Sequence, residues 1–288
     1  MYAVNGISCQ DCHMVDINTF RRSADTFQKP ERREYHHYFN GANFMMYFLG
    51  VLKAKKEGNA ELAANLQHKY EMAVLRLQYA AELEVSPVYN NDTGKLTQVK
   101  VRVYNRRAGH NLPTSLNARQ MWLEVMITDA SGKIIKKSGF MDDKGTLDTN
   151  TRIFNSIGMD VDMHHANNFW DIIYFTRINN ILPKGYRDVY YTIFGNQLEQ
   201  EIKVKVKLRF RQFDQGAAER LLTHLPKGVN LMELYGLREI PAVPVVDMVD
   251  KNMTFSAFKP SNIAEVIDKA VSLEKNILAH DGINPVVN

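Results

Sequence analysis

Two cysteines and a histidine near the start of the chain have the types and spacing of a cofactor-attachment site. The chain of 288 residues contains two cysteines, both within the run Cys9-Gln10-Asp11-Cys12-His13. Thiols three positions apart lie on one face of a single helical turn, where each can form a thioether with one vinyl group of a haem. The histidine that follows can then present its imidazole to the iron from the same side. Cys-x-x-Cys-His is the attachment pattern of c-type haem, so Cys9, Cys12 and His13 predict one covalent haem c.

Other chemistry of paired cysteines fits this sequence less well. A zinc site needs four ligands, and His36 and His37 could add two imidazoles to the two thiols. These histidines are adjacent, however, whereas the two histidines of such sites are usually separated by about three to five residues. A thioredoxin-like dithiol lies beside a βαβ unit, and too few residues precede Cys9 to form its first strand. A plain disulfide is a further alternative. A disulfide framework is excluded, because it needs more than two cysteines.

The haem iron usually takes a second axial ligand from the protein, and nine histidines are present. The nearest candidates are His36 and His37, at the start of an expected helix. We expect His37 to bind the iron opposite His13, with His36 as the second candidate and His110 as the third. A methionine ligand would raise the reduction potential, but Met45 and Met46 fit the core of the expected helix better.

The periodicity of apolar residues predicts an α+β fold. Helical spacing over residues 39–84, broken at Gly58-Asn59, predicts a helical hairpin. After Ser86-Pro87 the period changes to two, which predicts antiparallel strands. These strands are expected near 97–103, 121–127, 133–138, 172–176, 188–194, 202–210 and 241–249, with a short helix over 214–225. We therefore expect a haem segment and helical hairpin over residues 1–86, an immunoglobulin-like antiparallel β-sandwich over 87–261, and a helical tail over 262–288.

Three segments resemble the C-terminal part of multihaem c-type cytochromes. They are SCQDCHM at 8–14, HHYFNGAN at 36–43 and GHNLPT at 109–114. In that family a last haem-binding segment is followed by a helical stretch and a β-rich domain. The resemblance implies electron transfer, export, bis-histidine ligation and close contact between haems, and His110 matches the loop histidine of the pattern. This chain has one haem motif, so the other haems of such a protein are expected in a missing portion or on partner cytochrome subunits. In the second case the protein would be oligomeric.

The expected location is periplasmic or extracellular, because haem c is attached outside the cytoplasm. The first eight residues contain neither a charged n-region nor an apolar h-region. The haem motif begins so close to Met1 that we expect the chain to be a piece of a longer protein. No apolar run approaches the roughly 18 residues of a membrane helix. The net charge of +4 is too small to indicate nucleic acid binding.

The favoured function is an electron carrier rather than an enzyme. One alternative is a haem enzyme or sensor with an open distal site, in which Arg32, Arg33 and His36 could assist chemistry. Another is a β-sandwich assembly module without haem. His164 and His165 are expected in a polar loop.

Overall fold

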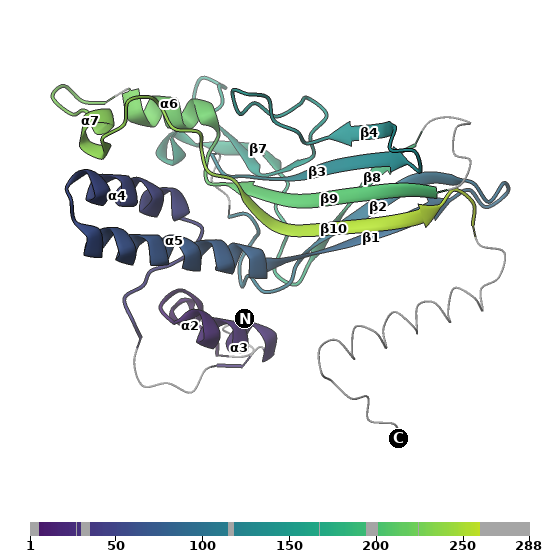
Figure 1. Ribbon diagram of the computed structural model, residues 1–288, viewed down its shortest axis with the longest axis horizontal. Helices are drawn as coiled ribbons and strands as arrows, with labels where there is room; N and C mark the ends of the chain where they lie inside the picture. Colours follow the sequence, from purple (N-terminus) through teal and green to yellow (C-terminus); the bar gives the residue numbers. More distant parts are fainter. Residues whose placement is uncertain are drawn as a thin grey trace.

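The structure, a computed structural model, describes residues 6–26, 28–29, 35–114, 118–166, 168–193, 201–223 and 225–259. Helices occupy most of the first part of the chain, and strands most of the rest (Figure 1). The helices are α2 (Cys9–His13), α3 (Ile17–Thr26), α4 (Phe44–Lys56), α5 (Ala60–Ala80), η1 (Phe169–Asp171), α6 (Gln215–Thr223) and α7 (Leu231–Tyr235). The strands are β1 (Ala81–Tyr89), β2 (Leu96–Asn105), β3 (Gln120–Asp129), β4 (Ile134–Ser138), β5 (Ile153–Phe154), β6 (Ser156–Met159), β7 (Tyr174–Ile178), β8 (Tyr186–Thr192), β9 (Glu201–Arg211) and β10 (Val246–Ser256).

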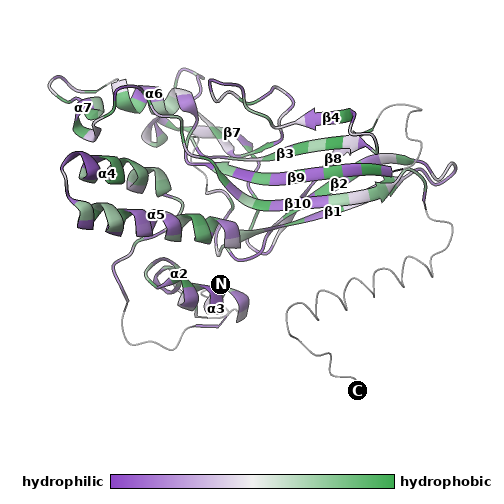
Figure 2. Cartoon of the chain, viewed as in Figure 1, coloured by the Kyte–Doolittle hydropathy of each residue, from purple (hydrophilic) through white to green (hydrophobic). Residues whose placement is uncertain are grey.

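The strands form three antiparallel sheets. One has the order β10-β9-β3-β4, with β5 also paired to β3, the second has the order β1-β2-β8, and the third is the β6-β7 pair. Apolar and polar residues alternate along β9 (Figure 2), as the sequence predicts. The register places apolar residues of β3 opposite apolar residues of β9: Leu123 pairs with Leu208, and Val125 with Val206. Such cross-strand pairs on a buried face stabilise the sheet.

The two larger sheets and the helical hairpin share one hydrophobic core. Val101 of β2 and Leu123 of β3 are fully buried in the same cluster as Phe44 of α4 and Leu77 of α5. The α+β fold class is therefore confirmed. The immunoglobulin-like sandwich is not confirmed, because the strands are divided among several sheets that do not close.

The helical hairpin forms where the sequence predicts it, but its second helix ends early. Gly58, at φ +70, ends the turn between α4 and α5 in the left-handed conformation that glycine tolerates best. We expected helix up to residue 84 and strand periodicity only after Ser86-Pro87. Instead α5 ends at Ala80 and β1 starts at once, so the expected boundary between residues 86 and 87 lies inside a strand. Pro87 is accommodated because β1 is the edge strand of its sheet.

Other strand and helix positions differ from expectation mainly at their ends. The strand expected at 241–249 is β10, which starts and ends later; those expected at 172–176 and 188–194 are β7 and β8, each shifted by about two residues. The predicted helix over 214–225 is α6. The helical tail expected over 262–288 lies outside the described residues. Among the helices that are described, none has both the length and the hydropathy of a membrane span.

Candidate functional site

The two cysteines and His13 lie on one short helix, α2, whose start is fixed by a buried carboxylate. Asp11 Oδ2 accepts hydrogen bonds from the Ser8 backbone N–H at 2.7 Å and from the Ser8 hydroxyl at 2.8 Å. The Tyr35 hydroxyl donates to Asp11 Oδ1 at 2.6 Å. Burial alone would raise the pKa of Asp11, but these hydrogen bonds outweigh it and lower the pKa below its ordinary value. A charged Asp11 therefore holds Ser8 and Tyr35 against the helix that carries the thiols.

The two thiols differ in environment. Cys9 is exposed, Cys12 is half-buried, and both are free. Burial and the nearby charge of Asp11 raise the pKa of Cys12 to about 11. At neutral pH the Cys12 side chain is therefore mainly the neutral thiol.

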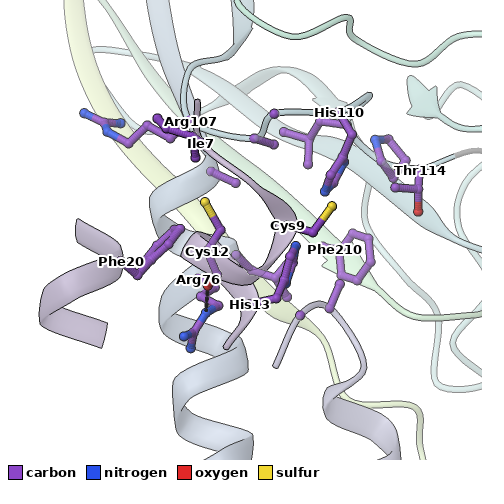
Figure 3. A pocket seen from close by; sticks show the side chains of 18 of the residues that line it. Ile7, Cys9, Cys12, His13, Phe20, Arg76, Arg107, His110, Thr114 and Phe210 are labelled. Carbon is purple, nitrogen blue, oxygen red and sulfur yellow. Dashed lines mark hydrogen bonds between the residues drawn. The ribbon is translucent and has the colours of Figure 1, made fainter. Parts of the chain in front are cut away.

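A mostly apolar pocket opens beside α2. Its volume is about 380 Å³, within the range of small-molecule and cofactor sites. The walls come from segments far apart in the sequence: α2 and α5, the loop 108–114, and Phe210 of β9 (Figure 3). Apolar side chains form much of the lining, among them Ile7, Phe20, Leu77, Leu112 and Phe210.

His13 and His110 point toward one another across this pocket (Figure 3). Their ring centroids are 6.2 Å apart and their planes differ by 13°. His13 Nδ1 lies 2.7 Å from the backbone oxygen of Asn40, and His110 Nδ1 lies 2.9 Å from the backbone oxygen of Asn111. Because a carbonyl oxygen only accepts, each Nδ1 carries the hydrogen and each Nε2 keeps its lone pair free when the ring is neutral.

The environment of His13 favours the neutral, metal-binding form of its ring. Burial lowers the pKa of His13, against the opposing effect of the hydrogen bond to Asn40, and the nearby His110 and Arg76 lower it further. Gly41 leaves room for the ring: a Cβ at this position would lie 3.4 Å from both Nδ1 and Cε1 of His13. A larger residue there would therefore press on the imidazole.

Asn40 and Arg76 hold the segment after the motif against α5. Asn40 is fully buried; its side chain donates to Lys69 O at 2.7 Å and accepts from Arg76 Nη1 at 3.0 Å. Arg76 Nε also donates to Cys12 O at 3.1 Å. Burial lowers the pKa of Arg76 to about 10, so it stays charged at neutral pH. The same network thus connects α5, the Cys12 backbone and the carbonyl that orients His13.

The loop that carries His110 is held by a buried asparagine and a neighbouring strand segment. Asn105 donates to His110 O at 2.8 Å and to Ile181 O at 3.0 Å. Leu112 and Ile181 exchange backbone hydrogen bonds of 2.9 and 2.8 Å. His110 itself is exposed, but its backbone is therefore fixed to the sheet region.

The other candidate histidines lie elsewhere. His36 and His37 are exposed, and neither lines the pocket, contrary to the expectation that His37 faces His13. The ring of His36 lies near Tyr38, and that of His37 near Phe39. Arg32 and Arg33 lie outside the described residues. Within the described part of the chain no group of three or more His, Cys, Asp or Glu side chains is placed to hold a metal ion.

Comparison with known proteins gives structural likeness but no match in sequence. No family model matches the chain, and no curated protein matches it. Among solved structures, the chain is similar to a penta-heme cytochrome c552 from Thermochromatium tepidum, with a TM-score of 0.48 and 15% sequence identity. The match covers 88% of this chain and 48% of the other, so this chain spans about half the length of that cytochrome.

Proposed function

We propose that this chain binds one haem c covalently through Cys9 and Cys12, with His13 and His110 as its two axial ligands. We propose further that it transfers electrons outside the cytoplasm. The motif supports covalent attachment, and the placement of the two imidazoles supports the ligand pair. His110 thus replaces His37 as the proposed distal ligand.

The separation of the two imidazoles is the observation that carries the proposal. Two metal–imidazole bonds of about 2 Å each, with half a ring on either side, add up to about 6 Å between ring centres. The centroids of His13 and His110 are 6.2 Å apart. Stacked rings in van der Waals contact would be closer, so this spacing fits two rings that share one metal between them. The hydrogen-bonded Nδ1 atoms fit as well, because metal-binding histidines usually donate their other N–H to a carbonyl or carboxylate.

Each part of the site has a defined task in this proposal. When bound, haem c supplies an iron that accepts and returns one electron. His13 and His110 would both hold the iron, the Asn40 carbonyl orients His13, and the apolar lining would exclude water from the ring. With two protein ligands no position would remain for a substrate, which favours electron transfer over turnover.

The rest of the chain is then a scaffold and a docking unit. We propose that the two larger sheets act together as a sandwich-like support for the His110 loop, and that α5 connects them to the haem segment. The proposed partners are other cytochrome subunits or haem-bearing segments, in the periplasm or at the cell surface. This fits the resemblance of the three sequence segments to multihaem cytochromes.

The test is production of the chain in a periplasm with haem c maturation, beside a control cytochrome. We expect one haem mass retained on denaturation and a low-spin visible spectrum. His110→Ala should convert the ferric protein to a high-spin form, while the matched variants His36→Ala and His37→Ala stay low-spin. A colourless protein beside a matured control would refute the proposal. A high-spin His37→Ala protein with a low-spin His110→Ala protein would refute the ligand assignment alone.

A further inference from the structure

Three arginines line the pocket, and two of them are already engaged. Arg76 donates to carbonyl oxygens and to Asn40. Arg107 forms ion pairs with Asp25 at 3.0 Å and with Glu82 at 2.8 Å. Each of these guanidinium groups therefore has a structural task within the protein.

The third arginine, Arg119, is different. It lines the same pocket and is half-buried, yet it has no ion pair or hydrogen bond with any residue that the structure describes. Burial alone lowers its pKa, so its charge is held in an environment that disfavours it. A buried cation without a partner is costly, and an anion in the pocket would relieve that cost.

A second unpartnered group lies on the same pocket. The Thr114 hydroxyl is buried and has no hydrogen-bond partner among the described residues. Thr114 ends the loop that carries His110 and is drawn with the pocket in Figure 3. Buried polar atoms are normally satisfied, and an exception in a pocket indicates a ligand atom that completes the bond.

We propose that Arg119 and Thr114 bind a carboxylate of the pocket's ligand, and that this carboxylate is a haem propionate. This inference rests on the proposed function. The guanidinium can donate two parallel N–H bonds to a carboxylate, and the threonine hydroxyl can donate a third. The apolar part of the lining suits the ring, while these two groups suit an acidic substituent. They would hold the acidic edge of the ring, while the two thioethers to Cys9 and Cys12 would fix its rotation.

The test compares two porphyrins that differ only at their acidic groups. The full chain carrying Cys9→Ala and Cys12→Ala is titrated with haemin and with haemin dimethyl ester, in the same detergent, and binding is followed by visible absorbance. We expect haemin to bind about tenfold tighter than the ester, or more, because the ester cannot accept charge-assisted bonds as a carboxylate does. Arg119→Gln should remove this preference, and Thr114→Val should reduce it. Arg152 is exposed and lies outside the pocket, so Arg152→Gln is the matched control and should keep the preference for haemin.

The outcomes separate this inference from the proposed function. Equal binding of the two porphyrins by the chain with Arg119 intact would overturn the inference while leaving haem binding in place. This comparison needs no arginine variant, so it holds even if Arg119→Gln fails to fold. A preference that survives in a folded Arg119→Gln protein would also overturn it. Failure of the chain with both cysteines to retain haem, beside a matured control cytochrome, would overturn the proposed function, and this inference with it.

Discussion

Replacing Asn40 by alanine removes the side chain that connects α5 to the segment after the haem motif. Two hydrogen bonds are lost: the one that Asn40 donates to Lys69 O at 2.7 Å and the one that it accepts from Arg76 Nη1 at 3.0 Å. The hydrogen bond between His13 Nδ1 and the Asn40 backbone oxygen can remain, because alanine keeps that carbonyl.

The expected fall in the free energy of unfolding follows from the type of each hydrogen bond. A neutral hydrogen bond contributes about 1 kcal/mol, and one to a charged group about 1.5–3 kcal/mol. Asn40 is fully buried, so water does not replace either partner. The free energy of unfolding should therefore fall by about 3 kcal/mol for Asn40→Ala. In a protein of this size, that corresponds to a fall in Tm of about 6–12 °C.

The assay is urea unfolding followed by circular dichroism, on the chain without haem. Asn65→Ala is the matched control, because Asn65 is exposed on α5; its effect should stay within about 0.5 kcal/mol. A loss below about 1 kcal/mol for Asn40→Ala, at an unchanged m-value, would refute the conclusion that this network holds the motif in place.

Three further predictions concern the motif and its ligands. The planes of the His13 and His110 rings are 13° from parallel, so both imidazoles should split the iron d orbitals along the same direction. The low-spin ferric protein should therefore give a rhombic electron paramagnetic resonance spectrum. A single large-g signal would contradict near-parallel rings. Because the folded-state pKa of Asp11 lies below 3.8, its stabilisation is present above that pH and is lost as the pH falls through the folded value. Asp11→Asn should therefore be less stable than wild type at neutral pH in urea unfolding. The difference in free energy of unfolding should shrink below about pH 3.8, and a difference that stays constant with pH would contradict the lowered pKa of Asp11. In the chain without haem, an alkylating reagent at pH 8 should modify exposed Cys9 faster than Cys12, whose pKa is about 11. Mass spectrometry follows the modification of each thiol, and equal rates would contradict this prediction.

The sequence predicts seven of the ten described strands, because their alternating pattern is local; β1, β5 and β6 were not expected as strands. Val101 in β2, Leu123 in β3 and Val206 in β9 lie on buried faces as the alternation of apolar residues predicts. The start of β1 was missed because Ala80 and Ala81 are compatible with a longer helix. Pairing with β2 decides the conformation there, and pairing is not visible in a local pattern.

The proposed ligand pair shows the same limit more sharply. His37 is closer to His13 in the sequence, but His110 faces it in the fold, because Asn105 and Ile181 fix the loop from the sheet side. Only a tertiary arrangement can select between such candidates. The family resemblance of the 109–114 segment was the one signal for His110 in the sequence.

Arg76 was missed for a related reason. It lies beside Leu77 on a helix whose apolar positions include Ala73 and Ala80, where an arginine is usually a surface residue. The structure buries it because the carbonyl of Cys12 and the side chain of Asn40 accept its hydrogen bonds. No pattern within α5 reveals that another segment supplies those acceptors.

The order in which the pocket's walls occur along the chain has a consequence for biogenesis. Cys9 and Cys12 precede the His110 loop and Phe210 in the chain. If haem c is attached as proposed, export from the N-terminal side would present both thiols before the later walls have folded. Cys12 is half-buried in the folded chain, so attachment would be easiest at that stage. Docking of the sheets would then bring His110 to face His13. A failure of that docking would leave the proposed haem attached but without its second protein ligand.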